Sequence, residues 1–123
     1  MSQTGKPLLI LVVDDDPLVL MGTVDMLEDL GHLVMPAKSG LQALDILQET
    51  RVDLVLTDQS MPQMTGSQLA TRIRALHPDL PIVLVTGYAA LPQDLPLGVR
   101  RLGKPFSQND LIRVVADVKR PAA

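Results

Sequence analysis

Short, uninterrupted aliphatic runs constrain this chain more than any other feature of its sequence. Leu8–Val13 is six aliphatic residues in a row, and Leu54–Leu56 and Ile82–Val85 are equally free of polar side chains. Such runs are too short for independent helices. Because they do not alternate with polar residues, they predict strands that are covered on both faces. Strands of this kind belong to parallel sheets packed between helices.

Segments with helical periodicity separate these aliphatic runs. Leu20, Val24 and Leu27 recur at helical spacing, and similar patterns follow along the chain. The expected helices begin near Pro17, Ser39, Gly66 and Ser107. Helices that alternate with short buried strands predict a parallel α/β sheet with right-handed crossovers.

Two weaker segments complete the set of five strands. His32–Ala37 contains Pro36, which cannot donate to a ladder of hydrogen bonds, so this strand is expected at an edge of the sheet. Val99–Leu102 is a short fifth strand. The stretch before it, Tyr88–Gly98, holds two prolines, so any fourth helix there is expected to be short or broken.

Length and composition predict one domain and argue against nucleic acid or a membrane as its partner. The chain has 123 residues, of which 8–119 are expected to form the domain, with a leader or linker at 1–7 and a tail at 120–123. A net charge of −3 offers no basic surface for nucleic acid, and no apolar run is long enough to span a membrane. The chain has no cysteine and no signal-peptide pattern, so a cytoplasmic location is expected.

Polar side chains follow four of the expected strands at their carboxyl ends. They are Asp14, Asp15, Asp58, Thr86 and Lys104. Because ligands of parallel α/β sheets bind outside the carboxyl ends of the strands, we expect these side chains to meet on one rim. Crowded carboxylates favour a nearby cation, and Mg²⁺ prefers oxygen ligands while it bridges to phosphate oxygens. The chemistry that fits is transfer of a phosphoryl group to a carboxylate.

Four motifs, each after an expected strand, make the chain resemble a response regulator receiver domain of two-component signalling. They are Val-Val-Asp-Asp-Asp-Pro, Thr-Asp-Gln-Ser-Met-Pro with Gly66 after it, Val-Thr-Gly, and Lys-Pro-Phe. The resemblance extends from Leu8 to about Val118. It implies a flavodoxin-like three-layer sandwich with a single parallel sheet of strand order 2-1-3-4-5, which agrees with an edge position for Pro36.

The resemblance also implies roles for the acidic residues. Asp58 is expected to accept a phosphoryl group from a sensor histidine kinase or a histidine phosphotransfer protein. Asp15, Asp58 and the backbone carbonyl of Ser60 are expected to bind Mg²⁺ directly, and Asp14 through water. The resemblance names no output partner. It implies a signalling domain that phosphorylates and dephosphorylates itself, and no enzyme acting on external substrates.

Of the residues that would respond to phosphorylation, two match the pattern of the family and one departs from it. Thr86 is expected to hydrogen-bond the phosphoryl group and Lys104 to pair with it, and Lys104-Pro105 resembles the family's cis peptide. Many members carry an aromatic ring three residues before this lysine, where this chain has Arg101, which cannot bury as a ring does. Tyr88, two residues after Thr86, is the substitute that the sequence offers.

Two other functions stay open on the sequence alone. A degenerate receiver that serves only as a protein-interaction module is compatible with Arg101. A phosphohydrolase resembling haloacid dehalogenases would carry a second aspartate two residues after Asp58, where Ser60 stands, so this function is disfavoured. The phrases Thr-Gly-Tyr-Ala and Lys-Pro-Phe-Ser most resemble receivers attached to hybrid sensor kinases.

Purely structural roles are the alternative for several residues. The acids 14–16 could cap the helix that follows them, since carboxylates are favoured at helix starts, but capping would explain only one or two of the three. His32 and His77 are expected to be solvated or to cap helices rather than to bind metal. Met61 and Met64 are expected to fill the core.

Overall fold

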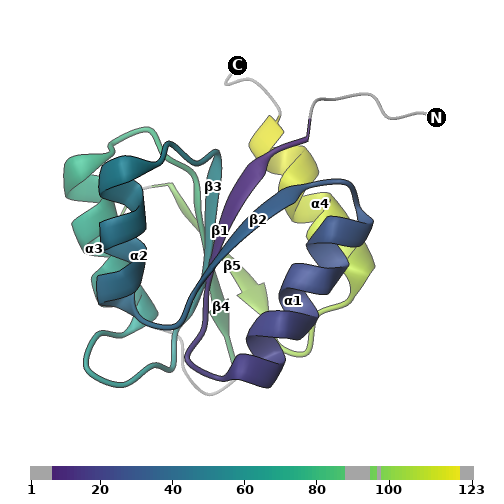
Figure 1. Cartoon of the computed structure of the whole chain (residues 1–123), viewed down its shortest axis with the longest axis horizontal. Coiled ribbons are helices and arrows are strands. Elements are labelled where there is room, and N and C mark those ends of the chain that lie inside the picture. Colours follow the sequence, from purple (N-terminus) through teal and green to yellow (C-terminus); the bar gives the residue numbers. More distant parts are fainter. Residues whose placement is uncertain (1–6, 88–94, 97, 120–123) are drawn as a thin grey trace.

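Figure 1 shows a sheet seen edge-on with helices on both of its faces. The computed structural model describes residues 7–87, 95–96 and 98–119. In chain order the elements are β1 (Leu9–Val13), α1 (Pro17–Asp29), β2 (Leu33–Ala37), α2 (Gly40–Glu49), β3 (Leu54–Asp58), α3 (Gly66–Leu76), β4 (Ile82–Thr86), β5 (Val99–Gly103) and α4 (Gln108–Lys119). Strands and helices alternate as predicted from β1 to β4 and from β5 to α4.

All five strands are parallel, in the order β2-β1-β3-β4-β5. This confirms the predicted fold class and strand order. Pro36 lies in β2 opposite Val12 of β1, and β2 forms an edge of the sheet. The edge position fits the chemistry of proline, because an outer strand has one side on which no ladder hydrogen bond is needed.

The sheet separates two hydrophobic clusters. Leu11 packs with Ile73 of α3 in the cluster on the face covered by α2 and α3. The neighbouring Ile10 packs with Leu27 of α1 and Leu111 of α4 on the opposite face. Successive strand residues point to opposite faces. The inner strands therefore need apolar side chains at every position, which explains their uninterrupted aliphatic runs.

Side chains at the helix starts explain where two of the helices begin. Asp16 accepts hydrogen bonds from the backbone amides of Leu18 and Val19, so it caps α1, with Pro17 in the first turn. Ser107 and Asp110 bond reciprocally at the start of α4: each side chain accepts from the backbone amide of the other, at 3.2 and 2.8 Å. Both arrangements follow the spacing seen in the sequence.

The two histidines lie in different environments. His32 is buried, and its Nδ1 accepts a hydrogen bond from the backbone amide of Leu8 at 3.0 Å, so the expectation that it is solvated or caps a helix was wrong. His77 caps the carboxyl end of α3, as expected. The expected short or broken helix lies mostly outside the described residues, and 95, 96 and 98 are not helical.

Candidate functional site

Three carboxylates meet where β1 and β3 end. Asp14 and Asp15 directly follow β1, and Asp58 is the last residue of β3. One oxygen from each lies within 4.8 Å of the others. Asp14 and Asp58 are buried, whereas Asp15 is exposed. The parallel topology places these residues together even though more than forty positions separate them in the chain.

Backbone hydrogen bonds hold the two buried acids in place. The amide of Asp14 donates to the carbonyl of Ala37 at 3.1 Å, which prolongs the pairing of β1 with β2. One carboxylate oxygen of Asp14 accepts from the amide of Asp16 at 2.9 Å. Asp58 lies opposite Val85 of β4 in the register of the sheet. Strand pairing therefore places the backbones of both acids, with Asp58 inside β3 and Asp14 directly after β1.

Lys104 brings a positive charge to this cluster. Its Nζ lies 2.6 Å from Oδ1 of Asp58, and its backbone amide donates to the carbonyl of Thr86 at 2.8 Å. The side chain of Lys104 is 35% exposed and that of Asp58 only 6%, so the ion pair reaches from the surface into the site. The peptide bond from Lys104 to Pro105 is cis.

Burial and the neighbouring charges both act on the pKa of the Asp14 carboxyl. Burial raises the pKa of the Asp14 carboxyl above its ordinary value of 3.8, and the nearby carboxylates of Asp58 and Asp15 raise it further. The amide of Asp16 and the charge of Lys104 oppose this rise in pKa. One ammonium group thus faces three carboxylates.

The ligand chemistry of the cluster fits a hard divalent cation. Its side-chain donors are all carboxylate oxygens, which Mg²⁺ prefers over nitrogen or sulfur. The carbonyl of Ser60 lies two residues beyond Asp58 on an exposed turn and would add a fourth oxygen. Such a cation would supply the positive charge that the cluster lacks.

The residues expected to report phosphorylation lie at different depths. Thr86 ends β4 and is only 3% exposed, one residue beyond the partner of Asp58 in the sheet. Arg101 is exposed on β5, opposite Leu84, so it does not take the place of a buried ring. Tyr88 lies outside the described residues.

Sequence reasoning missed the side chains that complete the site. A small pocket at the cluster is lined by Thr23 of α1 and by Phe106, together with Asp14, Asp58 and Lys104. Thr23 belongs to no motif that would have singled it out, whereas Phe106 ends the Lys-Pro-Phe motif but was given no role in the site. Thr23 contributes because helical spacing turns it inward, and Phe106 because it follows the turn after Lys104.

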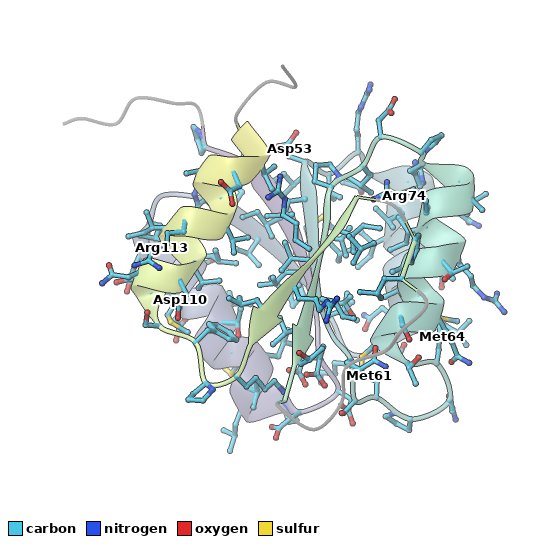
Figure 2. The ribbon with its side chains drawn as sticks, turned by 180° about the vertical axis from the view of Figure 1, so that it is seen from behind. Asp53, Met61, Met64, Arg74, Asp110 and Arg113 are labelled. Carbon is cyan, nitrogen blue, oxygen red and sulfur yellow. The ribbon has the colours of Figure 1, made fainter. Side chains whose placement is uncertain are left out.

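The loop that leaves Asp58 is tied to α3, and this too was missed. Thr65 caps α3, and with Gln68 it forms a reciprocal capping box. The Thr-x-x-Gln spacing was a readable sequence signal. Met61 and Met64 are buried in the core beside this loop, as predicted, at the end of the molecule to which the strands point (Figure 2).

A larger hollow in the described part of the chain lies away from these acids. It measures about 720 Å³ and is lined by residues 47–53 and 76–81, at the ends of α2 and α3. Figure 2 shows one of its lining residues, Asp53, at the end of the molecule opposite to Met61 and Met64. The chemistry of the carboxylate cluster, and not the size of a cavity, therefore identifies the candidate site.

Comparison with known protein families gives a match over nearly the whole domain. The response regulator receiver domain family matches residues 10–116. A sensor kinase of Brucella abortus, CckA, is 38% identical over 117 residues, which are 89% of this chain but only 12% of that protein. A response regulator receiver protein of the same organism, CpdR, is 37% identical over 86% of this chain and 92% of its own length.

Solved structures show the same fold. The response regulator protein TrrA of Thermotoga maritima, in complex with Mg²⁺ and BeF, superposes with a TM-score of 0.83 at 30% identity. The match covers 89% of this chain and 97% of that one. A receiver domain protein of Clostridium thermocellum superposes with a TM-score of 0.80 at 27% identity, over 89% and 92% of the two chains.

Proposed function

Because this chain belongs to the response regulator receiver domain family, we propose that Asp58 accepts a phosphoryl group from a histidine kinase or a histidine phosphotransfer protein. One observation carries the assignment to this residue. The buried carboxylate of Asp58 lies 2.6 Å from Lys104 and within 4.8 Å of both Asp14 and Asp15, at the carboxyl ends of the strands.

Mg²⁺ is the proposed cofactor of this site. Asp15, Asp58 and the carbonyl of Ser60 would hold it directly, and Asp14 would contact it through water. When bound, Mg²⁺ would neutralise charge on the phosphoryl oxygens. The all-oxygen donor set supports this proposal, and the similar Thermotoga maritima protein was solved in complex with Mg²⁺ and BeF.

Asp58 needs no general base, because an ionised carboxylate is already a nucleophile. Its oxygen forms a bond to phosphorus while the bond from phosphorus to the imidazole nitrogen of the donor breaks, and that nitrogen keeps the electron pair. The ammonium of Lys104 then pairs with a phosphoryl oxygen instead of Oδ1 of Asp58. The hydroxyl of Thr86 donates to another phosphoryl oxygen.

The output of this phosphorylation is proposed to pass through β4 and β5. Thr86 and Lys104 are joined by a backbone hydrogen bond, so a movement of either residue affects both strands. The similarity to a sensor kinase and to a separate receiver protein supports a place in a two-component pathway. The proposed location is the cytoplasm. In the described ranges, no helix is long and apolar enough to cross a membrane.

Phosphorylation by a small donor tests the proposed function. The protein is incubated with Mg²⁺ and acetyl phosphate, and intact mass is measured before and after treatment with base. We expect a base-labile phosphoryl adduct in the parent protein and in Asp45→Asn, a control at an exposed carboxylate of α2, and none in Asp58→Asn.

The same experiment separates the other functions. A parent protein that forms no adduct would favour a domain that only binds partners. An adduct that persists in Asp58→Asn would assign phosphorylation to another residue. Steady release of phosphate from external esters would favour a phosphohydrolase.

A further inference from the structure

The backbone of Gln59, the residue directly after Asp58, is hydrogen-bonded on two sides. Its amide donates to the carbonyl of Val85 at 2.9 Å, which prolongs the pairing of β3 with β4 by one residue. Its carbonyl accepts from the amide of Gly66, the first residue of α3, at 3.1 Å. The peptide leaving Asp58 is therefore joined both to the sheet and to a helix.

The side chain of Gln59 makes a second connection to the same helix. Its Oε1 accepts from the backbone amide of Ser67 at 2.7 Å, and its Nε2 donates to Oγ of Ser67 at 3.2 Å. Backbone amides in the first turn of a helix have no partner within the helix. Gln59 supplies the partner for Ser67, and only one orientation of its amide group satisfies both bonds.

The start of α3 is a firm support for this connection. Thr65 caps the helix, and the capping box with Gln68 satisfies a further amide of the first turn. Gly66 packs directly on the backbone of Asp58, where a Cβ would collide with the carbonyl oxygen of Asp58. The side-chain amide of Gln59 is thus bonded to the start of α3, and this helix end is itself packed against β3, the strand that carries Asp58.

Ser60 is exposed, and it makes no hydrogen bond of its own to the part of the chain that the structure describes. The amide of Met61, which belongs to the same planar peptide as the Ser60 carbonyl, donates to the carbonyl of Gln59 at 3.1 Å. The direction of the Ser60 carbonyl therefore depends on how Gln59 is held.

We propose that Gln59 is a positioning residue for the metal site. Its side-chain amide, bonded to Ser67, holds the peptide between Asp58 and Ser60 so that the Ser60 carbonyl and the Asp58 carboxylate converge on one cation. The inference rests on the proposed function, because it takes the carbonyl of Ser60 as a ligand of Mg²⁺. Residues that orient metal ligands commonly change metal affinity by about 10–100-fold when they are replaced.

A Mg²⁺ titration of the unphosphorylated protein tests this role. The dissociation constant is measured from backbone amide chemical shifts, without a phosphodonor. Gln59→Leu keeps much of the side-chain volume but loses both bonds to Ser67, and we expect Mg²⁺ to bind about tenfold more weakly. Gln48→Leu, the same change at an exposed glutamine of α2, is the matched control, and its Mg²⁺ affinity should stay near that of the parent.

A residue that only stabilises the fold would give another result. Its replacement would lower the thermal unfolding midpoint without Mg²⁺ but would leave the Mg²⁺ dissociation constant of the folded protein unchanged. Unchanged Mg²⁺ affinity in Gln59→Leu would therefore overturn the positioning role and leave the proposed function standing. Should Gln59→Leu fail to fold, Gln59→Met supplies the same comparison with a more adaptable side chain.

The parent protein and Asp58→Asn separate this inference from the proposed function. A parent protein that does not bind Mg²⁺, or an Asp58→Asn variant that binds it as tightly as the parent, would overturn the metal site and the role of Gln59 together. Tight binding by the parent, weak binding by Asp58→Asn and weakened binding by Gln59→Leu is the expected pattern.

Discussion

Lys104 and a divalent cation would compete for the carboxylate of Asp58. Nζ of Lys104 already lies 2.6 Å from Oδ1 of Asp58, and like charges repel strongly where water is partly excluded. Lys104→Met is therefore expected to bind Mg²⁺ severalfold more tightly than the parent. The measurement is a calorimetric or chemical-shift titration at fixed ionic strength.

Arg51→Met is the control for this prediction. Arg51 is exposed and lies between α2 and β3, before the amino end of the strand whose carboxyl end carries Asp58, so its replacement should leave the Mg²⁺ affinity near the parent value. Weaker Mg²⁺ binding by Lys104→Met would contradict the prediction. It would mean that Lys104 favours Mg²⁺ binding rather than competing with Mg²⁺ for Asp58.

Asp110 makes the stability of the protein depend on pH. The hydrogen bond from the backbone amide of Ser107 holds the pKa of Asp110 below its ordinary value of 3.8, and the hydroxyl of Ser107 and the charge of Arg113 act in the same direction. Figure 2 shows Asp110 and Arg113 on the same helix. A lowered pKa in the folded state means that the ionised carboxylate stabilises the fold above pH 3.8 and that this contribution is lost as pH falls through the folded-state pKa.

Asp110→Asn is accordingly expected to unfold at a lower temperature than the parent at neutral pH. The difference should shrink as pH falls below 3.8, because the parent then carries a neutral carboxyl as well. Thermal unfolding of both proteins across this pH range checks the prediction. A difference that stays constant with pH would show that the charge of Asp110 contributes nothing to the start of α4.

At the scale of the elements, replacing a glycine by alanine should stabilise the protein at one position and destabilise it at another. Gly22 lies inside α1, and a Cβ there would meet nothing within 4 Å. Gly22→Ala is expected to stabilise the protein by about 0.5–1 kcal/mol, since alanine loses less backbone entropy in a helix. In Gly66→Ala, by contrast, the added Cβ would collide with Asp58 and lie 2.6 Å from Leu84, and we expect a cost of about 1–3 kcal/mol.

Urea unfolding of the two variants and the parent measures both effects. A neutral Gly66→Ala would show that α3 can move away from β3 at no cost. It would also remove the support on which the proposed role of Gln59 depends. A Gly22→Ala variant that is less stable than the parent would mean that backbone entropy does not decide the effect of this substitution on the free energy of unfolding.

The strands and their order could be predicted because their signals are local. An aliphatic run without polar residues needs cover on both faces, and Pro36 restricts its strand to an edge. The start of α3 near Gly66 was predicted, but the capping box of Thr65 and Gln68 was overlooked although its spacing is readable in the sequence. His32 was misjudged because the group that it bonds, the amide of Leu8, is 24 residues away and comes near only in the folded sheet.

The meeting of the polar side chains could be predicted for the same topological reason. Parallel strands have their carboxyl ends at one rim, so residues after β1 and β3 had to lie near one another. The individual contacts could not be predicted. The 2.6 Å ion pair of Lys104 with Asp58 and the bonds from Gln59 to Ser67 depend on side-chain conformations that form only in the packed structure.

At the scale of the whole molecule, Mg²⁺ should stabilise the fold. Its proposed ligands come from the ends of two strands and form one site only when the sheet is complete. A ligand that binds only the folded state adds about 2.7 kcal/mol at roughly a hundred times its dissociation constant. We therefore expect the thermal unfolding midpoint to rise with Mg²⁺ concentration, and to rise much less in Asp58→Asn.

The control is a monovalent salt at matched ionic strength, which screens the repulsion among the carboxylates without binding between them. Equal stabilisation by NaCl and MgCl₂ would contradict a specific site. Without Mg²⁺, Asp58→Asn should be at least as stable as the parent, because it removes one of three crowded negative charges.

The two outer strands have a consequence for solubility. An open sheet edge is a template for pairing with another chain, and this sheet has one edge at β2 and one at β5. Pro36 interrupts the donors of β2, and Arg101 places an exposed charge on β5. If two copies paired through their β2 edges, the hydrogen-bond donor missing at Pro36 would interrupt the ladder. If they paired through their β5 edges, the positive charges of the two Arg101 side chains would repel. The chain is thereby protected against aggregation by strand addition, even though its inner strands are almost purely aliphatic.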